Sequence, residues 1–341
     1  MKRVLLLNDG KAGHFNQTLA VSFAIDTCYR PQTETAGIKV RRLGKYLLRW
    51  MLNHSFGKKI LEYPMLRSCI HCFYHIDIPL HSYDIIISSG KDTSLLNAWL
   101  GLLYGSHTIY IGNPKKLNPL LFDTVLTVLE HGFENEIVLD VAPTLPFQGE
   151  IDDFCQKMHL NKSAKYVTLL IGGDGSGYLY DEKDYDRLTA FVNRTAKEVN
   201  WLVTTSRRTP VEIEKKMQWE MKAAKFIAYH QNPQKVVAGF LTLSETVYVT
   251  EESASMVGEA IAAQKKVITL YPRYRKGDKD YQKILSKYRK NHRIVSWSME
   301  EMQDFNMQKV DITPSDSNSI DEMIMKLKER LNSETGSDSR H

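Results

Sequence analysis

Short apolar runs recur along this chain of 341 residues, and most are followed by a turn with glycine or hydroxyl residues and then by a segment with helical spacing. This alternation is typical of β-α-β units, in which the strands run parallel and helices cover the sheet. The runs expected to form strands are 3–8, 83–89, 107–112, 123–128, 165–173, 200–206, 225–230, 245–251 and 265–272. The sequence therefore predicts an α/β fold with two tandem Rossmann-like, doubly wound domains facing a central cleft.

The two series of strands are separated by a less regular stretch, about residues 140–164, which contains two prolines. At roughly 150 residues per domain, the length of the chain also favours two domains. The predicted segments are an N-terminal domain at 1–149, a C-terminal domain at 150–312, and a tail at 313–341 with a short amphipathic helix at 319–331 and a disordered end.

Composition places the chain in the globular class, because 43% of its residues are hydrophobic and can form a large core. No run of about 18 uncharged apolar residues is present, and the chain enters a strand directly, so we expect neither a membrane span nor a signal peptide. The few, unevenly spaced cysteines argue against a disulfide scaffold and favour a cytoplasmic location. They are Cys28, Cys69, Cys72 and Cys155.

The first predicted strand ends in the sequence NDGKAGH, residues 8–14. Because ligands of open α/β sheets bind at the carboxyl ends of the strands, this loop is a candidate site. Asp9 and His14 are the two groups in it that can act as a general base. The alternative is that Asp9 caps a helix and that His14 is an ordinary hydrogen-bonded side chain.

Two strand ends in the second domain carry groups that suit a nucleotide. The sequence LLIGGDGSGY places Gly172, Gly173 and Ser176 where backbone N–H groups can face a phosphate. Its spacing matches neither G-x-x-x-x-G-K-[ST] nor G-x-G-x-x-G, and a tight turn without a ligand is the alternative. The sequence TTSRRTP follows another strand with Arg207 and Arg208, whose guanidinium groups suit a diphosphate or a carboxylate. We expect Arg208→Ala to weaken nucleotide binding with little change in melting temperature.

A third strand end, VTEESASMVGEA at residues 249–260, leads into a helix through small hydroxyl residues. Ser253 and Ser255 favour a helix start for structural reasons alone. Glu259 lies four residues after Ser255, where a carboxylate can reach the ribose hydroxyls of a nucleotide whose phosphate rests on the helix start. The combination favours a nucleotide site.

A zinc site is the weaker interpretation of the segment RSCIHCFYHID, residues 67–77. Cys69-x-x-Cys72 with a nearby histidine can bind zinc, but no second pair follows at the spacing of a zinc finger. We therefore expect free thiols, no metal and no cofactor.

The basic character of the chain is concentrated in residues 39–67, where eight lysines and arginines face the single acid Glu62, a net charge of +7. Apolar residues, among them Tyr46 and Trp50, recur between them near helical spacing. This pattern indicates a helix that lies on an anionic surface. A core-facing helix with a solvated basic back explains the pattern equally well.

A family resemblance emerges from seven motifs taken in chain order: DGKAGHFNQ, SSGKDTS, IGNPKK, FDTVLTVLEH, LLIGGDGSGY, TTSRRTP and VTEESASMVGEA. Over about residues 3–297 the chain resembles the family named after the mitochondrial-fission ELM-one protein, whose architecture is that of GT-B glycosyltransferases. The resemblance implies sugar transfer from a CMP-Kdo-type or UDP-activated donor. It leaves the stereochemical outcome open, and the base candidate in the first loop favours inversion. The resemblance also implies an anionic glycolipid of the lipopolysaccharide core as acceptor, at the cytoplasmic face of the inner membrane.

The same resemblance distributes roles among the residues. In the first loop we favour Asp9 as the base, with His14 contacting the acceptor or the donor phosphate. The residues implied in donor binding are Gly172, Gly173, Ser176, Ser206, Arg207, Arg208, Glu251, Ser253, Ser255, Met256 and Glu259. Those implied in acceptor binding are Gly10, Lys11, Gly13, Gln17, Ser89 and Lys91. The chain departs from the family pattern on the acceptor side, at Lys91-Asp92, where two basic residues are expected, and at Gly132, where an acid is expected.

Two functions of other classes remain open. The first is a membrane-associated scaffold that keeps the fold without sugar transfer, and loss of the donor site would distinguish it. The second is nucleic-acid binding through residues 39–67, which we rank last because no recognised motif is present and aromatic residues are few among the basic ones. The expected partners are a nucleotide-sugar, the anionic glycolipid and the membrane surface, and no nucleic acid.

Overall fold

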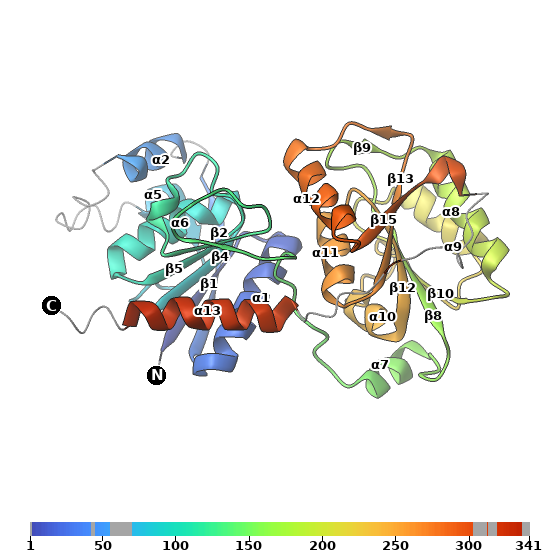
Figure 1. Ribbon diagram of the computed structural model, residues 1–341, viewed down its shortest axis with the longest axis horizontal. Coiled ribbons are helices and arrows are strands. Elements are labelled where there is room, and N and C mark those ends of the chain that lie inside the picture. Colours follow the sequence, from blue (N-terminus) through green and yellow to red (C-terminus); the bar gives the residue numbers. More distant parts are fainter. Residues whose placement is uncertain (1, 42–44, 55–69, 303–311, 313–318, 336–341) are drawn as a thin grey trace. The chain divides into compact units, whose positions relative to one another are not determined.

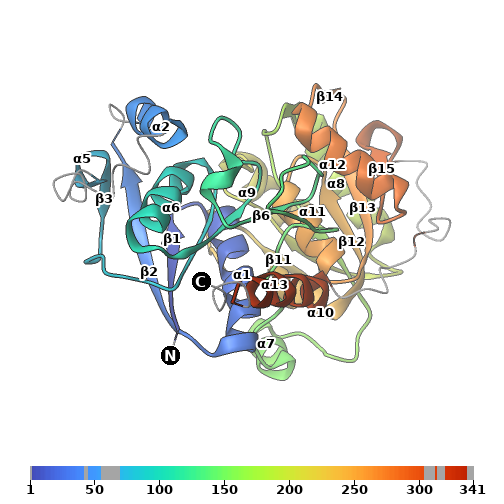
Figure 2. The same ribbon diagram turned by 60° about the vertical axis from the view of Figure 1, so that its left-hand side comes forward.

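The computed structural model describes residues 2–41, 45–54, 70–302, 312 and 319–335 (Figures 1 and 2). It separates into an N-terminal unit, residues 1–145 with 319–341, and a C-terminal unit, residues 146–318. The chain thus leaves the N-terminal unit at residue 145, where the sequence predicted 149. It returns to that unit at residue 319, where the sequence predicted a separate tail.

Seven strands form one sheet in the N-terminal unit, in the order β3-β2-β1-β4-β5-β6-β7. Neighbouring strands are parallel except β2 and β3, which are antiparallel. The strands are β1 (Arg3–Asn8), β2 (Gln32–Val40), β3 (Tyr74–Ile76), β4 (Ile85–Ser89), β5 (His107–Ile111), β6 (Thr124–Thr127) and β7 (Glu136–Val138). The helices are α1 (Ala12–Tyr29), α2 (Lys45–Asn53), α5 (Ile70–Phe73), α6 (Lys91–Tyr104), the short η2 (Pro119–Leu121) and α13 (Ser319–Thr335).

Both faces of this sheet are covered, which explains why its central strands are almost entirely apolar. Successive side chains of β1 point to opposite faces. Leu5 and Leu7 pack in one cluster with Trp99 of α6, whereas Val4 and Leu6 pack in another with α1. The loops at the carboxyl end of β1 therefore stand on a rigid core.

The C-terminal helix α13 completes the second of these clusters. It lies along α1 (Figure 1) and buries Met323, Leu327 and Leu331. These residues follow helical spacing and form one apolar stripe. The amphipathic helix that the sequence assigned to a tail is thus part of the core of the N-terminal unit.

The C-terminal unit contains a six-stranded parallel sheet in the order β11-β10-β8-β12-β13-β15, and a two-stranded antiparallel ribbon of β14 and β9. The strands are β8 (Tyr166–Leu170), β9 (Tyr178–Leu179), β10 (Asn200–Thr204), β11 (Lys225–Ile227), β12 (Ser244–Thr250), β13 (Lys266–Tyr271), β14 (Tyr274–Arg275) and β15 (Ile294–Ser298). The helices are α7 (Ile151–Met158), α8 (Glu182–Thr195), α9 (Val211–Glu220), α10 (Val237–Leu243), α11 (Ala254–Ala262), α12 (Lys279–Lys290) and the short η3 (Met299–Glu301).

Helices cover both faces of this sheet as well. Leu169 and Val203 pack with Leu188 of α8 in one cluster, and Leu202 packs with Phe240 of α10 in another. The two units therefore have separate cores and the same doubly wound plan. This confirms the predicted α/β fold with two Rossmann-like domains.

The strand order reverses next to the first strand of each unit. β1 lies between β2 and β4, and β8 lies between β10 and β12. In doubly wound sheets, ligands bind at the carboxyl ends of the strands that flank this reversal. The loops after β1 and β4 in the N-terminal unit, and after β8 and β12 in the C-terminal unit, are therefore the places to look for a site.

Candidate active site

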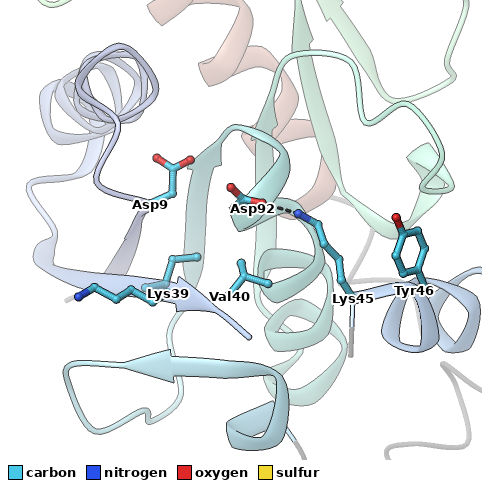
Figure 3. A pocket seen from close by; sticks show the side chains of 7 residues that line it. Asp9, Lys39, Val40, Lys45, Tyr46 and Asp92 are labelled. Atoms are coloured by element: carbon cyan, nitrogen blue, oxygen red, sulfur yellow. Dashed lines mark hydrogen bonds and ion pairs between the residues drawn. The ribbon is translucent and has the colours of Figure 1, made fainter. Parts of the chain in front are cut away.

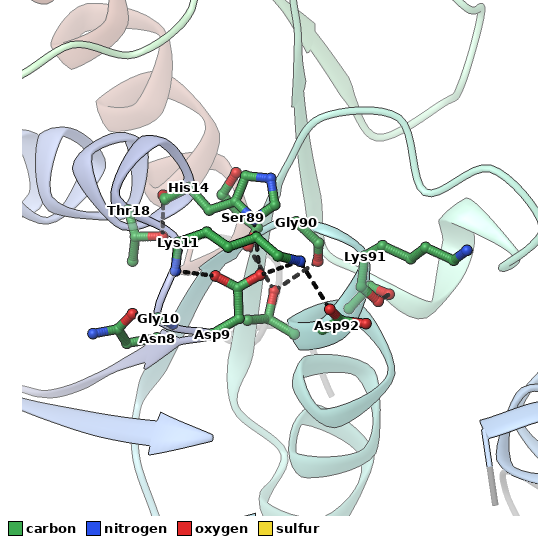
Figure 4. Close-up of polar contacts among 12 residues, drawn as sticks. Asn8, Asp9, Gly10, Lys11, His14, Thr18, Ser89, Gly90, Lys91 and Asp92 are labelled. Carbon is green, nitrogen blue, oxygen red and sulfur yellow. Dashed lines mark hydrogen bonds and ion pairs between the residues drawn. The ribbon is translucent and has the colours of Figure 1, made fainter. Parts of the chain in front are cut away.

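Asp9 follows β1 directly and is largely enclosed, with 3% of its side chain exposed (Figure 4). Its Oδ1 accepts a hydrogen bond from the backbone N–H of Lys11 at 3.1 Å, and its Oδ2 lies 2.8 Å from Nδ1 of His14. Lys11 occupies the N-cap position of α1, without a side-chain cap. Asp9 therefore shapes the turn and holds His14, and the alternative in which it caps the helix does not describe this loop.

His14 stands in the first turn of α1 with 37% of its side chain exposed. Because a carboxylate can only accept hydrogen bonds, the contact with Asp9 places the imidazole proton on Nδ1 and leaves the lone pair on Nε2. Gly90, after β4, makes room for the ring, since a Cβ at this glycine would overlap it. Gly90 also has φ +95°, which few other residues adopt. The two loops of the switch point thus meet at His14.

Asp92, in the first turn of α6, binds two lysines. Its Oδ2 lies 2.9 Å from Nζ of Lys11, and its Oδ1 accepts a hydrogen bond from Lys45 of α2. Burial alone would raise the pKa of Asp92, but the hydrogen bonds and charges of the two lysines outweigh it and lower that pKa to about 2. The hydrogen bond to Asp92 in turn raises the pKa of Lys11. At this position, where the sequence resemblance led us to expect a basic residue, the chain holds an anion that compensates two cations.

A cavity of about 570 Å³ opens in front of these groups (Figure 3). This volume is typical of small-molecule sites. Two carboxylates and two lysines line it together with apolar side chains, a mixture that suits a hydroxylated ligand. The lining residues are Asp9, Ile38, Lys39, Val40, Lys45, Tyr46 and Asp92.

The remaining residues predicted for the acceptor have different surroundings. Gln17 of α1 accepts a hydrogen bond from Ser89 of β4 at 2.7 Å, so this pair joins the two elements behind the loop. Gly10 is exposed with φ +77°, which permits the turn. Gly13 lies in the first turn of α1. Lys91 is exposed and extends away from Asp9 (Figure 4).

In the C-terminal unit, hydrogen bonds within the protein hold the glycine loop after β8. The N–H of Gly172 donates to Oγ1 of Thr250 at 2.7 Å, and the N–H of Gly173 donates to Oε1 of Glu252 at 3.1 Å. A Cβ at Gly172 would overlap the Glu252 carboxylate, and one at Gly173 would overlap the carbonyl of Arg208. These glycines permit close contact between loops, and their N–H groups are not directed at a phosphate as the sequence suggested.

Glu252 is the centre of this cluster and has no exposed side-chain surface. Its carboxylate accepts hydrogen bonds from Arg208 at 3.0 Å and from the hydroxyl of Tyr180 at 2.5 Å. Burial raises the pKa of Glu252 in spite of these donors. The hydroxyl of Ser176 donates to the backbone carbonyl of Glu252 at 3.1 Å, which adds another hydrogen bond between the glycine loop and Glu252.

The two adjacent arginines have different environments. Arg208 is 30% exposed and bound to Glu252, whereas Arg207 is exposed. The hydroxyl of Ser206 accepts a hydrogen bond from the N–H of Arg208 at 3.2 Å and so shapes this turn. The predicted pair of phosphate ligands therefore consists of one arginine committed to a buried carboxylate and one at the surface.

Glu251 points to a different set of partners from its neighbour. Its carboxylate accepts hydrogen bonds from Tyr178 at 2.9 Å and Thr269 at 2.7 Å, and the guanidinium groups of Arg275 and Arg289 lie 3.5 and 3.6 Å away. Four donors thus surround a side chain without exposed surface. The structure gives Glu251 a role in holding β12, β13 and α12 together.

Helix α11 begins beside this cluster with an open N-terminus. Ser253 is at the N-cap position without a side-chain hydrogen bond, Ser255 is exposed and Met256 is buried. Glu259 lies one turn further on and has no hydrogen-bonding partner within the described residues. Burial raises the pKa of Glu259 to about 7. Of the predicted donor-binding residues, Arg207, Ser253, Ser255 and Glu259 are the ones whose polar side chains make no hydrogen bond within the described part of the chain.

Sequence reasoning did not find Glu252, Tyr180, Asp92 or Lys45. Glu252 stands next to Glu251, and nothing in the sequence tells which of two adjacent acids faces the glycine loop. Lys45 and Asp92 are 47 positions apart, and their contact depends on how α2 lies against α6. A signal was present for Asp92, because an acid in the first turn of a predicted helix beside a strand end is a candidate for a site.

Within the ranges 2–41, 45–54, 70–302 and 319–335, no group of three or more His, Cys, Asp or Glu side chains is arranged to hold a metal ion. Cys69 of the weaker zinc interpretation lies outside the described residues. No helix in the described part of the chain is long and apolar enough to cross a membrane.

Solved structures share the fold at low sequence identity. The co-structure of S. aureus MnaA with UDP has a TM-score of 0.54 at 12% identity and covers 97% of this chain and 97% of that one. The UDP-GlcNAc 2-epimerase from Methanocaldococcus jannaschii has a TM-score of 0.52 at 11% identity, and the match covers 96% of this chain and 99% of that one. Arabidopsis thaliana UGT89C1 complexed with UDP-L-rhamnose has a TM-score of 0.51 at 13% identity, and the match covers 96% of this chain and 93% of that one. At these identities the likeness shows the fold alone, that of the GT-B class.

Sequence comparison is more specific. A search of curated protein sequences found no match. The family model described as mitochondrial fission ELM1 matches residues 12–323, a range that includes the His14 turn, the glycine loop and Glu259. Because this match spans most of the chain and both units, the chain belongs to the mitochondrial fission ELM1 family.

Proposed function

We propose that this protein is a glycosyltransferase that moves a sugar from a nucleotide-activated donor to a hydroxyl of an acceptor. The observation that carries the proposal is the 2.8 Å contact between Asp9 and His14 at the switch point of the N-terminal sheet. A histidine that is partly exposed, with its Nδ1 held by an enclosed carboxylate, is arranged as a general base.

In this proposal His14 is the base and Asp9 positions it. Nε2 of His14 takes the proton of the acceptor hydroxyl, the oxygen forms a bond to the anomeric carbon of the donor, and the bond from that carbon to the phosphate oxygen breaks. The nucleotide departs with the electron pair of that bond. Direct displacement of this kind inverts the anomeric centre. The roles are the reverse of those favoured from sequence, because Asp9 is enclosed and both of its oxygens already accept hydrogen bonds.

We assign the donor to the C-terminal unit. The open N-terminus of α11 suits a phosphate, and Glu259 suits the ribose hydroxyls one turn further along. Arg207 is free to turn toward the phosphates, so that side chains and helix amides stabilise the leaving group without a metal ion. The solved structures named above contain UDP or UDP-L-rhamnose, or act on UDP-GlcNAc, which favours a UDP-sugar. A CMP-Kdo-type donor is the alternative implied by the family.

We assign an anionic glycolipid of the lipopolysaccharide core as acceptor, at the cytoplasmic face of the inner membrane. Helix α2 supports membrane contact, because Tyr46, Leu47 and Trp50 are 78%, 54% and 51% exposed beside Lys45 and Arg49. Apolar side chains flanked by basic ones are typical of helices that lie on anionic bilayers. Residues 42–44 and 55–67 of the predicted basic segment lie outside the described residues.

A membrane-associated scaffold without transfer is the second candidate. It is favoured by the internal use of the glycine-loop amides and of Arg208, since these groups bind Thr250 and Glu252. A scaffold of this kind would keep the fold and bind no nucleotide.

A thermal-shift panel with CMP, UDP, GDP and ADP tests the proposal. A ligand that binds only the folded protein at 100 times its dissociation constant stabilises it by about 2.7 kcal/mol, enough for a clear rise in melting temperature. We expect one nucleotide, UDP first, to raise the melting temperature and the Glu259→Gln variant to lose most of that rise. No response to any of the four nucleotides would favour the scaffold.

A further inference from the structure

A second cavity of the N-terminal unit, of about 480 Å³, adjoins the one beside Asp9 and shares Lys45 and Tyr46 with it. Its described lining residues include five basic side chains and no acidic one. The basic residues are Lys45, Arg49, Lys91, Lys115 and Lys116.

Three segments far apart in the sequence bring these charges together. Lys45 and Arg49 stand one turn apart on α2, Lys91 begins α6, and Lys115 and Lys116 belong to the loop after β5. The loop has a defined shape, because Oδ1 of Asn113 accepts a hydrogen bond from the N–H of Lys115 at 2.7 Å. The convergence is therefore a property of the fold and not of one basic run.

Electrostatics favours an anion in this cavity. Asp92 binds Lys45 from outside the lining, and the described lining supplies no negative charge for Arg49, Lys91 and Lys116. Like charges around one cavity repel each other, and an anion between them removes that repulsion. Lys91 and Ser94 place the first turn of α6 at the wall, and Gly90 at its N-cap has no side chain to cap the helix. The N-terminus of α6 adds partial positive charge through the helix dipole.

Apolar side chains also line the cavity, namely those of Leu95, Tyr110 and Leu117. A cavity of this volume exceeds what an inorganic phosphate needs and lies in the range of small-molecule sites. The combination of basic and apolar side chains fits a ligand that carries both a phosphate group and the CH face of a sugar ring.

We propose that the basic cavity binds a phosphate group carried by a sugar of the acceptor, so that the acceptor is a phosphorylated saccharide. This assignment rests on the proposed transferase function for its place in the reaction. Lys45 borders both cavities, so the phosphorylated sugar lies next to the sugar in the cavity beside Asp9. The acceptor is thereby selected by a charge beside the reacting hydroxyl.

The probe that tests the proposal is glucose 6-phosphate, compared with glucose and with inorganic phosphate by isothermal titration calorimetry at low salt. The variant Lys91→Gln/Lys116→Gln removes two charges from the cavity. The matched control Lys197→Gln/Lys328→Gln removes two exposed lysines elsewhere. We expect the cavity variant to weaken glucose 6-phosphate binding at least about tenfold, the control to leave it unchanged, and glucose to bind to neither, because charge-assisted hydrogen bonds supply the affinity.

Four results would overturn the proposal. They are no binding of glucose 6-phosphate by the wild type, equal binding by the cavity variant, equal affinity for inorganic phosphate, and displacement of glucose 6-phosphate by anionic phospholipid vesicles, which would assign the cavity to lipid headgroups. The thermal-shift panel with the four nucleotides is measured on the same protein. If glucose 6-phosphate binds as expected while no nucleotide does, the phosphate site is supported and the transferase proposal fails.

Discussion

The guanidinium group of Arg208 lies 3.0 Å from the carboxylate of Glu252, whose side chain has no exposed surface. Arg208 therefore stabilises the C-terminal unit, and the sequence-based expectation that its removal leaves the melting temperature unchanged does not fit this geometry. A hydrogen bond to a charged group typically contributes about 1.5–3 kcal/mol, and a buried carboxylate that loses its cation is left uncompensated. We expect Arg208→Ala to lower the free energy of unfolding by about this amount.

Arg207→Ala is the matched control, because Arg207 is exposed and its removal is expected to change stability by less than about 0.5 kcal/mol. Urea unfolding of both variants measures the difference. Equal stability of the two would show that the Glu252 carboxylate does not depend on Arg208.

Glu259 predicts a pH dependence of stability. Burial raises its pKa in the folded protein from 4.5 to about 7, so between these values the folded state holds a proton that the unfolded state has released. The contribution of the Glu259 carboxyl to the free energy of unfolding is therefore present below about pH 4.5 and lost as the pH rises to about 7. Relative to Glu259→Gln, wild-type stability should fall across this window and then level off. Urea unfolding of both proteins at several pH values measures it, and parallel curves would contradict the burial of this carboxyl.

Asp92 predicts a dependence of the opposite sign. The pKa of Asp92 is lowered from 3.8 to about 2 in the folded protein, so its contribution is present above about pH 3.8 and lost as the pH falls toward 2. Because the side chain is 30% exposed, we expect Asp92→Asn to lower stability at pH 7 by only about 1 kcal/mol, and less at high salt. Unfolding at low and at high salt tests this, and an Asp92→Asn protein as stable as wild type at low salt would show that the two lysines do not depend on it.

Helix α2 predicts a separation of membrane binding from stability. Leu47 and Trp50 are exposed, so replacing both with serine should weaken co-sedimentation with anionic vesicles while leaving the free energy of unfolding nearly unchanged. Leu48 is fully buried beside them, and Leu48→Ala should instead cost about 2–5 kcal/mol of stability. Two results would contradict membrane binding by this helix. The wild type and the double variant bind anionic vesicles equally, or the wild type binds neutral vesicles as strongly as anionic ones.

The sequence predicted the plan of the fold because buried parallel strands are apolar throughout and end in recognisable turns. It missed β2, whose sequence QTETAGIKV mixes polar with apolar residues and which is only partly buried. It also missed β15, a short strand at the edge of its sheet. The place of α13 was not predictable, because an amphipathic stripe shows that a helix covers something and does not identify the partner.

The candidate site was predictable to the level of loops and not of contacts. Asp9 and His14 were found because a strand end in a doubly wound sheet is a place for ligands. Which of the two is enclosed depends on the path of the turn, and the structure encloses Asp9. The glycines after β8 were found too, but their reason is close contact with Glu252 and Arg208, which only the packing of the loops reveals.

Single-turnover sugar transfer by wild type, His14→Ala and Asp9→Asn, with radiolabelled donor and measured donor affinity, tests the central claim most directly. If His14 is the base, its removal should lower the rate roughly 10²–10⁴-fold, with donor affinity close to that of wild type. Asp9→Asn should also lower the rate, because an amide no longer fixes the proton on Nδ1. A His14→Ala protein that keeps more than about a tenth of the wild-type rate would contradict the account, because general-base catalysis contributes at least about a hundredfold.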